Sequence, residues 1–178
     1  AGNQPMKHPD DNSLTLVCNG EIYNYLELAN KYGFDLKTGS DSEIILQMYK
    51  KLGIEKTVNE LDGVFMFVLH DARTNTLFAS RDPMGVRPGF LGYKKNEIFI
   101  CSEAKPMMKF CDEITPFPPG TWWSSKNISQ YNRYFFYQAD RIDEYHEDVI
   151  CDEINRLLTS AVKKRLMSER EIGCLLSG

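Results

Sequence analysis

The first pattern along the chain is a short apolar segment, followed by polar residues and then by a helical repeat. Residues 14–17 (LTLV) have the apolar and β-branched character of a strand. The sequence CNGEIYN follows at 18–24, and its Asn-Gly dipeptide predicts a turn. Residues 23–32 then predict a helix, which we expect to end at Gly33 because glycine readily adopts the left-handed conformation there.

The clearest local pattern is an amphipathic helix that begins near residue 43. Ser40 and Glu43 have the spacing of a capping box, in which each side chain bonds a backbone N–H group at the start of the helix. We expect Gly53 to end the helix. The apolar residues between them repeat on one helical face, and they are Ile44, Ile45, Met48, Tyr49 and Leu52.

After Gly63 the pattern changes from helix to strand. The apolar run 64–69 (VFMFVL) predicts a strand that is buried on both faces. Further strands are predicted at 76–80, 89–93 and 97–101, and segments 121–123 and 131–137 also have strand character. Because helices come first and the middle strands follow one another without helices between them, the predicted fold class is α+β rather than a wound βαβ sheet.

The last part of the chain has a different character. Residues 139–147 are charged, as expected of a linker, and residues 147–167 predict a second amphipathic helix with acidic residues at its start and basic residues at its end. Residues 172–176 (IGCLL) predict a buried strand that runs into Ser177 and Gly178. We therefore expect two domains, 1–139 and 140–178, the second of them cut short at its C-terminus.

Composition and charge narrow the classes of function. The 178 residues are 42% hydrophobic and 26% charged, as in an average globular protein, and the net charge of −4 argues against binding nucleic acid or an anionic membrane. No apolar run reaches the roughly 18 residues that a membrane span needs. The five scattered cysteines lack the spacing of a metal site, so we expect no metal, and free thiols favour a cytoplasmic location.

The candidate chemistry lies at Asn19, Gly20 and Glu21. A side-chain amide and a backbone N–H group that converge at a strand end suit the oxyanion that develops during acyl transfer. Glu21 adds an acceptor for a substrate ammonium group. The alternative at this point is an ordinary Asn-Gly turn with no function.

Several motifs together resemble one family, the glutamine-dependent asparagine synthetases of eukaryotic type. The resemblance covers nearly the whole chain and is most specific near its C-terminus. The motifs are CNGEIYN at 18–24, Asp41 with EIIL at 43–46, LDGVF at 61–65, RD with GVRP at 81–88, CSEAK at 101–105, AVKKRLM at 161–167 and IGCLLSG at 172–178.

The resemblance implies a fold, an activity and roles for particular residues. The fold would be the four-layer αββα sandwich of the N-terminal-nucleophile hydrolases, followed by the first helix and strand of a pyrophosphatase-loop domain. Residues 1–139 would then be a glutaminase domain, truncated at its N-terminus, and 140–178 the start of a synthetase domain. Glutamine hydrolysis would supply ammonia for the amidation of aspartate through an aspartyl-adenylate, with ATP and Mg²⁺ used by the synthetase domain and no cofactor by the glutaminase domain.

Carried over residue by residue, Asn19 and Gly20 would form the oxyanion hole, while Glu21 and Asp41 would hold the α-amino group of glutamine. Leu176, Ser177 and Gly178 would open the ATP-binding loop, since a loop before a helix N-terminus is a natural phosphate site. The implied partners are the small molecules glutamine, aspartate and ATP, with no nucleic acid and no membrane. A homodimer stays open, as do the oligomeric state and the route of the ammonia.

Other interpretations of single residues remain. Asp41 lies at a helix N-terminus, where a carboxylate also stabilises the helix dipole. Arg81 and Arg87 are typical of salt bridges at a sheet edge and have no assigned chemical role. Glu103, near Lys105, is typical of a structural or channel-lining residue.

The chain departs from the family pattern at its start. The family nucleophile is an N-terminal cysteine, whereas this sequence begins with Ala1 and Gly2, and Cys18 is poorly placed to replace it. We therefore expect a fragment without activity of its own, preceded in its gene by Met-Cys-Gly and followed by Gly-Leu-Asp-Ser-Ser. The alternatives are an amidophosphoribosyltransferase-like glutaminase, a β-lactam synthetase-like enzyme with a non-catalytic first domain, and a regulatory glutamine-binding module.

Overall fold

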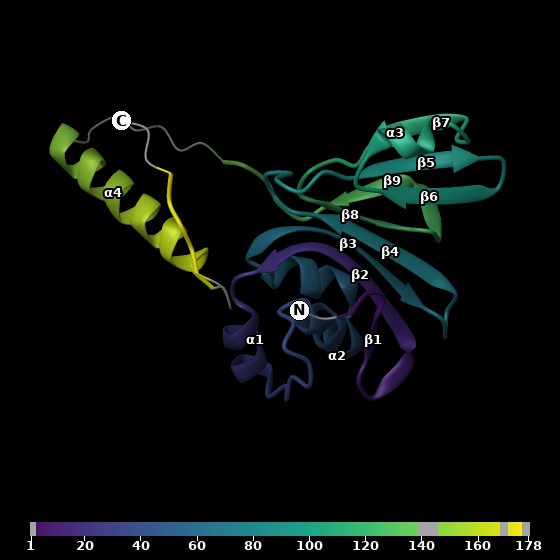
Figure 1. Cartoon of the computed structure of the whole chain (residues 1–178), viewed down its shortest axis with the longest axis horizontal. Helices are drawn as coiled ribbons and strands as arrows, with labels where there is room; N and C mark the ends of the chain where they lie inside the picture. The colour runs from purple at the N-terminus through teal and green to yellow at the C-terminus, as the bar shows by residue number, and fades with distance from the viewer. Residues whose placement is uncertain (1–2, 139–145, 168–170, 176–178) are drawn as a thin grey trace. The chain divides into compact units, whose positions relative to one another are not determined.

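The structure is a computed structural model that describes residues 3–138, 146–167 and 171–175. It divides into two units, Ala1–Phe136 and Tyr137–Gly178, which are described separately (Figure 1). The functional division into domains 1–139 and 140–178, which the family resemblance implies, stays a prediction.

The first unit is built on a six-stranded antiparallel sheet with the strand order β1-β2-β3-β4-β8-β9. The long central pair β2 and β3 is in register from Leu14 opposite Asp71 to Ile22 opposite Gly63. The strands are β1 (Met6–His8), β2 (Asp11–Ile22), β3 (Gly63–Asp71), β4 (Thr76–Arg81), β8 (Thr121–Ser124) and β9 (Asn127–Arg133).

A second, three-stranded antiparallel sheet has the order β6-β5-β7. Its strands are β5 (Phe90–Lys94), β6 (Glu97–Cys101) and β7 (Glu113–Pro116), and the short helix α3 (Ala104–Met107) follows β6. A Cβ added at Gly92 of β5 would lie 2.3 Å from the Met107 methyl carbon, so α3 packs closely on this sheet. In Figure 1 the three strands lie on the side of the large sheet opposite α1 and α2.

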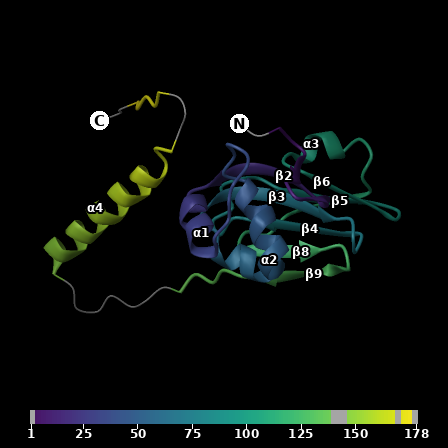
Figure 2. The ribbon, with the colours of Figure 1, turned by 90° about the horizontal axis from the view of Figure 1, so that it is seen from below.

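Two helices cover one face of the large sheet (Figure 2). They are α1 (Tyr25–Tyr32) and α2 (Glu43–Glu60), and α1 ends as predicted at Gly33, whose φ is 70°. Gly53 interrupts α2 with φ 79° and ψ 172°, so it ends the first part of the helix but a second part continues to Glu60. The helices and the sheet enclose one apolar core, whose fully buried side chains include Leu14, Leu16, Ile22, Ile44, Ile45, Met48, Phe65, Phe67 and Leu69.

A second core lies between the two sheets. Trp123, Phe117 and Leu91 are fully buried there, together with Met66 and Ala79. Phe65 and Met66 therefore belong to different cores although they are neighbours in β3, because successive side chains of a strand point to opposite faces. The predicted burial of 64–69 on both faces is confirmed, and so is the α+β class with antiparallel sheets.

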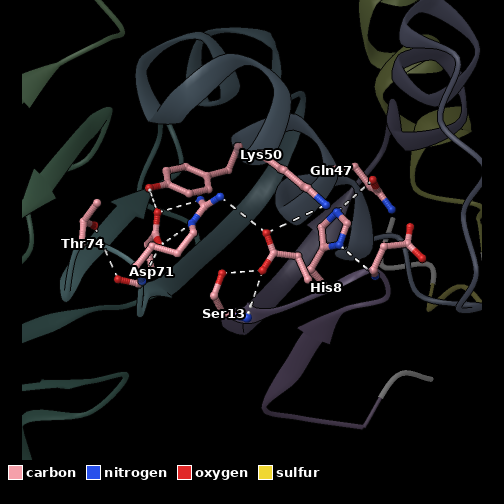
Figure 3. Close-up of polar contacts among 10 residues, drawn as sticks. His8, Ser13, Gln47, Lys50, Asp71 and Thr74 are labelled. Atoms are coloured by element: carbon pink, nitrogen blue, oxygen red, sulfur yellow. Dashed lines mark hydrogen bonds and ion pairs between the residues drawn. The ribbon is translucent and has the colours of Figure 1, made fainter.

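A polar network fixes the two hairpins of the large sheet against α2 (Figure 3). The Asp71 carboxylate is 3% exposed and accepts two hydrogen bonds from the Arg73 guanidinium, at 2.9 and 2.8 Å, and one from the Tyr49 hydroxyl at 3.0 Å. The Asp11 carboxylate in turn lies 3.5 Å from Arg73 and 3.9 Å from Lys50. The β1–β2 turn, the β3–β4 turn and α2 are thereby joined through charged side chains.

Several sequence predictions in this unit are wrong. Asn19-Gly20 does not form a turn: β2 continues through Ile22, because residues 18–22 pair with β3, and the turn comes only at Tyr23 and Asn24. Ser40 and Glu43 form no capping box, because α2 begins at Glu43 itself and the Glu43 carboxylate bonds the N–H groups of Lys37 and Thr38. The sequence also missed β7 and placed β9 several residues too late.

The second unit contains α4 (Glu147–Lys164), close to the helix predicted at 147–167. The apolar side chains Ile154, Leu157, Leu158 and Val162 are each more than half exposed. The strand predicted at 172–176 is absent from residues 171–175, which are exposed and irregular, because no strand pairs with them among the described residues. None of the helices in the described ranges combines the length and the apolar character that a membrane-spanning helix needs.

Candidate active site at the open edge of β2

The candidate site begins where β1 stops covering the edge of β2. β1 pairs with β2 only up to Met6 opposite Leu16, and the Gln4 side chain then continues the pairing. It accepts from the Cys18 N–H at 2.9 Å and donates to the Cys18 carbonyl at 2.6 Å. Among the described residues no strand covers the edge of β2 beyond this point, at Gly20.

The backbone N–H of Gly20 points to this open edge. Along a strand, the backbone groups of alternate residues point to the same side. The Cys18 N–H bonds Gln4 and the Ile22 N–H bonds the Asp41 carboxylate, so both point away from β3. Gly20 lies between them in the same alternation, and its N–H group therefore points to the same edge.

The side chain of Asn19 lies on the face of β2 that looks toward the second sheet. Asn19 is opposite Met66, which belongs to the core between the sheets, and its Nδ2 lies 3.4 Å from the Ser102 hydroxyl just after β6. Glu21 shares this face of the strand and is exposed, like Asn19. Two adjacent residues thus present an amide group and a backbone N–H group at one corner of the sheet, as an oxyanion site requires.

Asp41 reaches the same edge from a distant part of the sequence. It lies in the loop between α1 and α2, and its Oδ2 accepts a hydrogen bond from the Ile22 N–H at 2.5 Å. The structure therefore brings Asp41 to the backbone of Ile22, which directly follows Glu21 and is nineteen residues earlier in the sequence. A carboxylate can bind an ammonium group, and this role of Asp41, which the family resemblance implies, stays a prediction.

Cys18 is unsuited to be the nucleophile of this site. Its side chain belongs to the core under the helices, on the face of β2 opposite Asn19. Burial raises the pKa of the Cys18 thiol to about 11, with smaller opposing effects from Ser42 and Arg87. Because the reactive form is the thiolate, Cys18 is inert near neutral pH.

The Arg81–Pro88 motif builds a rigid loop beside the site. The Arg81 guanidinium donates to three backbone carbonyls, those of Gly85, Arg87 and Phe117, each at 2.7 Å. Its partners are carbonyl groups and not carboxylates, so the scaffolding role is supported while the predicted salt bridge is wrong for Arg81. The motif also contains Asp82, for which the sequence predicted no role and which has a larger structural role.

Asp82 holds this loop on β3. Its carboxylate is 1% exposed and accepts from the N–H groups of Met84, Val86 and Arg87 in the loop and of Phe65 in β3, at 2.9–3.2 Å. Phe65 is the cross-strand partner of Gly20, so the loop is tied directly behind the candidate site. The Nε atom of Arg87 is buried without a hydrogen-bond partner among the described residues.

Glu103 directly follows Ser102, whose hydroxyl lies 3.4 Å from the Asn19 amide nitrogen. Glu103 is exposed at the start of α3. Leu176, Ser177 and Gly178, expected at an ATP site, lie outside the described residues. In the described ranges, no group of three or more His, Cys, Asp or Glu side chains is arranged to hold a metal ion.

Comparison with known proteins identifies the family of this chain and solved structures with the same fold. The profile of the glutamine amidotransferase domain matches residues 1–141, and the chain belongs to this family. Two solved structures share its fold, each with a TM-score of 0.63 over 75% of this chain: glutamine phosphoribosylpyrophosphate amidotransferase from B. subtilis, at 20% identity, and an allosteric regulatory enzyme of purine biosynthesis, at 21%. The chain covers 32% and 31% of these two proteins.

Curated relatives resemble the chain over its full length. It is 37% identical over 200 residues to a probable glutamine-hydrolysing asparagine synthetase of Acanthamoeba polyphaga mimivirus, covering 100% of the chain. It is 33% identical to the glutamine-hydrolysing asparagine synthetase of Gallus gallus and 37% identical to that of Sandersonia aurantiaca, covering 99% and 100% of the chain. The chain spans only 34–36% of the length of these relatives.

Proposed function

We propose that this chain is the glutamine-hydrolysing part of an asparagine synthetase, joined to the first residues of its ATP-dependent domain. The observation that carries the proposal is the extent of the similarity. The match to asparagine synthetases runs over the whole chain, beyond residue 141, where the match to the amidotransferase domain ends. In this proposal residues 1–139 form the glutaminase domain and residues 140–178 begin the synthetase domain.

The open edge of β2 supports a role in glutamine hydrolysis. When a nucleophile attacks the carboxamide carbon of glutamine, negative charge develops on the carboxamide oxygen, and two fixed N–H donors stabilise it. Asn19 and Gly20 provide these donors in the proposal, with the Asn19 amide turning from Ser102 to the substrate. Glu21 and Asp41 bind the α-ammonium group, which places the carboxamide over the donors.

The second half of the reaction belongs to the longer protein. The ammonia released from glutamine would amidate aspartate in an ATP-dependent domain that uses Mg²⁺, and Leu176, Ser177 and Gly178 would belong to its nucleotide site. A cytoplasmic location is part of the same proposal, and it is supported by the five cysteines, all of which are free thiols.

The proposal is tested by replacing Asn19 in the full-length protein. We expect Asn19→Ala to lower glutamine-dependent asparagine synthesis about 100-fold or more, because one oxyanion donor is lost. Ammonia-dependent synthesis should stay at the wild-type rate, since that reaction does not use the glutamine site. Asn12→Ala is the matched control, because Asn12 is an exposed residue of the same strand.

The outcomes separate the parts of the proposal. Equal losses with glutamine and with ammonia would contradict the oxyanion assignment. Glutamine hydrolysis that supports amide transfer to phosphoribosylpyrophosphate, and not to aspartate, would refute the synthetase assignment and retain the glutaminase.

A further inference from the structure

Glu43 is a buried carboxylate that the proposed reaction does not use. It is the first residue of α2 and is 0% exposed. Burying a charged carboxylate is costly unless hydrogen bonds compensate it. The compensation at Glu43 comes from the loop that carries Asp41, and this loop connects α1 with α2.

The Glu43 carboxylate hydrogen-bonds the backbone near the start of the loop between α1 and α2. Its two oxygens accept from the Lys37 N–H, both at 3.0 Å, and one of them also accepts from the Thr38 N–H at 2.6 Å. The residues between Thr38 and Glu43, including Asp41, are thus held at both ends by one side chain. Burial by itself would raise the pKa of Glu43, but the hydrogen bonds from Lys37 and Thr38 outweigh it and hold the pKa below its usual range.

A second contact links the Glu43 carboxylate through Gln47 to His8 in β1. Gln47, one turn further along α2, donates from Nε2 to Glu43 Oε1 at 3.2 Å. Its Oε1 lies 3.1 Å from His8 Nε2, and Figure 3 shows these two side chains pointing toward one another. His8 is 2% exposed, and its Nδ1 accepts from the Asp10 N–H at 3.1 Å, so Nε2 is the nitrogen that donates to Gln47.

The other end of the loop meets β2. Asp41 Oδ2 accepts from the Ile22 N–H at 2.5 Å, and Ile22 is two residues beyond Gly20 on the same edge. A shift of the loop would therefore move the Asp41 carboxylate along the edge where the substrate ammonium group is expected. A misplacement of about 1 Å in a binding group can cost on the order of 100-fold in rate.

We propose that Glu43 is a positioning residue, which sets the Asp41 carboxylate for the α-ammonium group of the amide substrate by holding the loop between α1 and α2. This inference rests on the proposed glutaminase function. Gln47 supports Glu43 in this role and has a smaller effect. Neither side chain contacts the substrate.

The test compares Glu43→Gln with the wild type in the full-length enzyme. The amide keeps the size of the side chain, but its NH₂ group faces backbone donors and cannot accept their hydrogen bonds. We expect the KM for glutamine to rise roughly tenfold, with kcat changed less than about threefold, because mainly ground-state binding is lost. Glu55→Gln is the control, since Glu55 is an exposed glutamate on the same helix.

A substrate without the α-amino group tests whether the effect of Glu43→Gln on KM depends on the ammonium group that Asp41 is proposed to bind. With glutaramate, which has the carboxamide and carboxylate of glutamine but no ammonium group, Glu43→Gln and the wild type should have KM values within about twofold of each other. Combining Glu43→Gln with Asp41→Asn should raise the KM for glutamine no further than Asp41→Asn alone, because residues that act through one another are not additive.

The results distinguish a wrong inference from a wrong function. If Asp41→Asn raises the KM for glutamine and Glu43→Gln does not, the positioning role is refuted and the glutaminase function stands. Equal losses with glutamine, glutaramate and ammonia would show that Glu43 is merely structural. If Glu43→Gln does not fold, Gln47→Met replaces it, and an unchanged KM for glutamine in that variant overturns the proposal. A wild-type enzyme that hydrolyses no glutamine would contradict the function itself.

Discussion

Replacing Gly20 by alanine should force β2 and β3 apart at the candidate site. A Cβ at this position would lie 2.2 Å from the Val64 carbonyl oxygen and 2.6 Å from the Phe65 Cα. Both obstacles are backbone atoms of a central strand and cannot rotate away. From the other strand, a Cβ at Gly63 would lie 2.2 Å from the Glu21 carbonyl oxygen, so the two strands approach closely at both glycines.

The size of the effect follows from this geometry. In the Gly20→Ala variant, the distances from the added Cβ to the nearest backbone atoms would be about 1 Å shorter than an ordinary van der Waals contact. Relieving the overlap strains the paired backbones and should lower the free energy of unfolding by roughly 1–3 kcal/mol, as overpacking generally does. The same displacement moves the Gly20 N–H group, and about 1 Å at a catalytic donor corresponds to a loss on the order of 100-fold.

Two measurements on the full-length protein test this reasoning. Urea unfolding gives the change in stability, and the rates of asparagine synthesis with glutamine and with ammonia give the change at the site. Gly39→Ala is the control, because a Cβ there meets no atom within 4 Å, and its stability should stay within about 0.5 kcal/mol of the wild type. A Gly20→Ala protein with wild-type stability and wild-type glutamine-dependent activity would refute the close approach of the strands.

Two further predictions concern stability. Asp82→Asn should lower the free energy of unfolding by roughly 2–4 kcal/mol in urea, because the amide cannot accept all four backbone N–H groups now bound; an effect no larger than that of exposed Asp112→Asn would contradict this. Burial, with help from Lys50, lowers the pKa of His8 below 6.5, so the unfolded state binds more protons and stability should fall as the pH drops through about 6.5. His8→Gln should reduce this pH dependence between about pH 7.5 and 5.5, and an identical pH profile would argue against it.

Residue types and their spacing were enough to predict the type and order of most elements in the first unit. The apolar face of α2 and the apolar run of β3 could be predicted, because the periods of a helix and a strand, 3.6 and 2 residues, appear directly in the local sequence. The end of α1 at Gly33 could also be predicted, because a helix often ends at a residue in the left-handed conformation and glycine adopts it readily. Asn19, Gly20 and Glu21 were proposed as site residues from their chemistry, with a turn as the alternative, whereas Asp41 was proposed from the family resemblance.

The roles of several of these residues depend on contacts with distant parts of the chain. Asn-Gly at 19–20 predicts a turn locally, yet pairing with β3 extends the strand through it and makes glycine necessary for close approach. Ser40 and Glu43 have the spacing of a capping box, but the Glu43 carboxylate instead closes the loop at Lys37. In both cases the local pattern was compatible with two structures, and contacts with residues outside the pattern selected one.

The open edge of β2 is likewise a tertiary property. Nothing in the local sequence indicates that the pairing of β1 ends before Gly20, or that Asp41 returns to the backbone at Ile22. The role of Asp82 could not be predicted for the same reason, because its hydrogen bonds join a loop to a strand seventeen residues earlier in the chain. Residue types and their periodicity determined the strands and helices, whereas the donors and carboxylates of the site acquired their positions only when distant segments packed together.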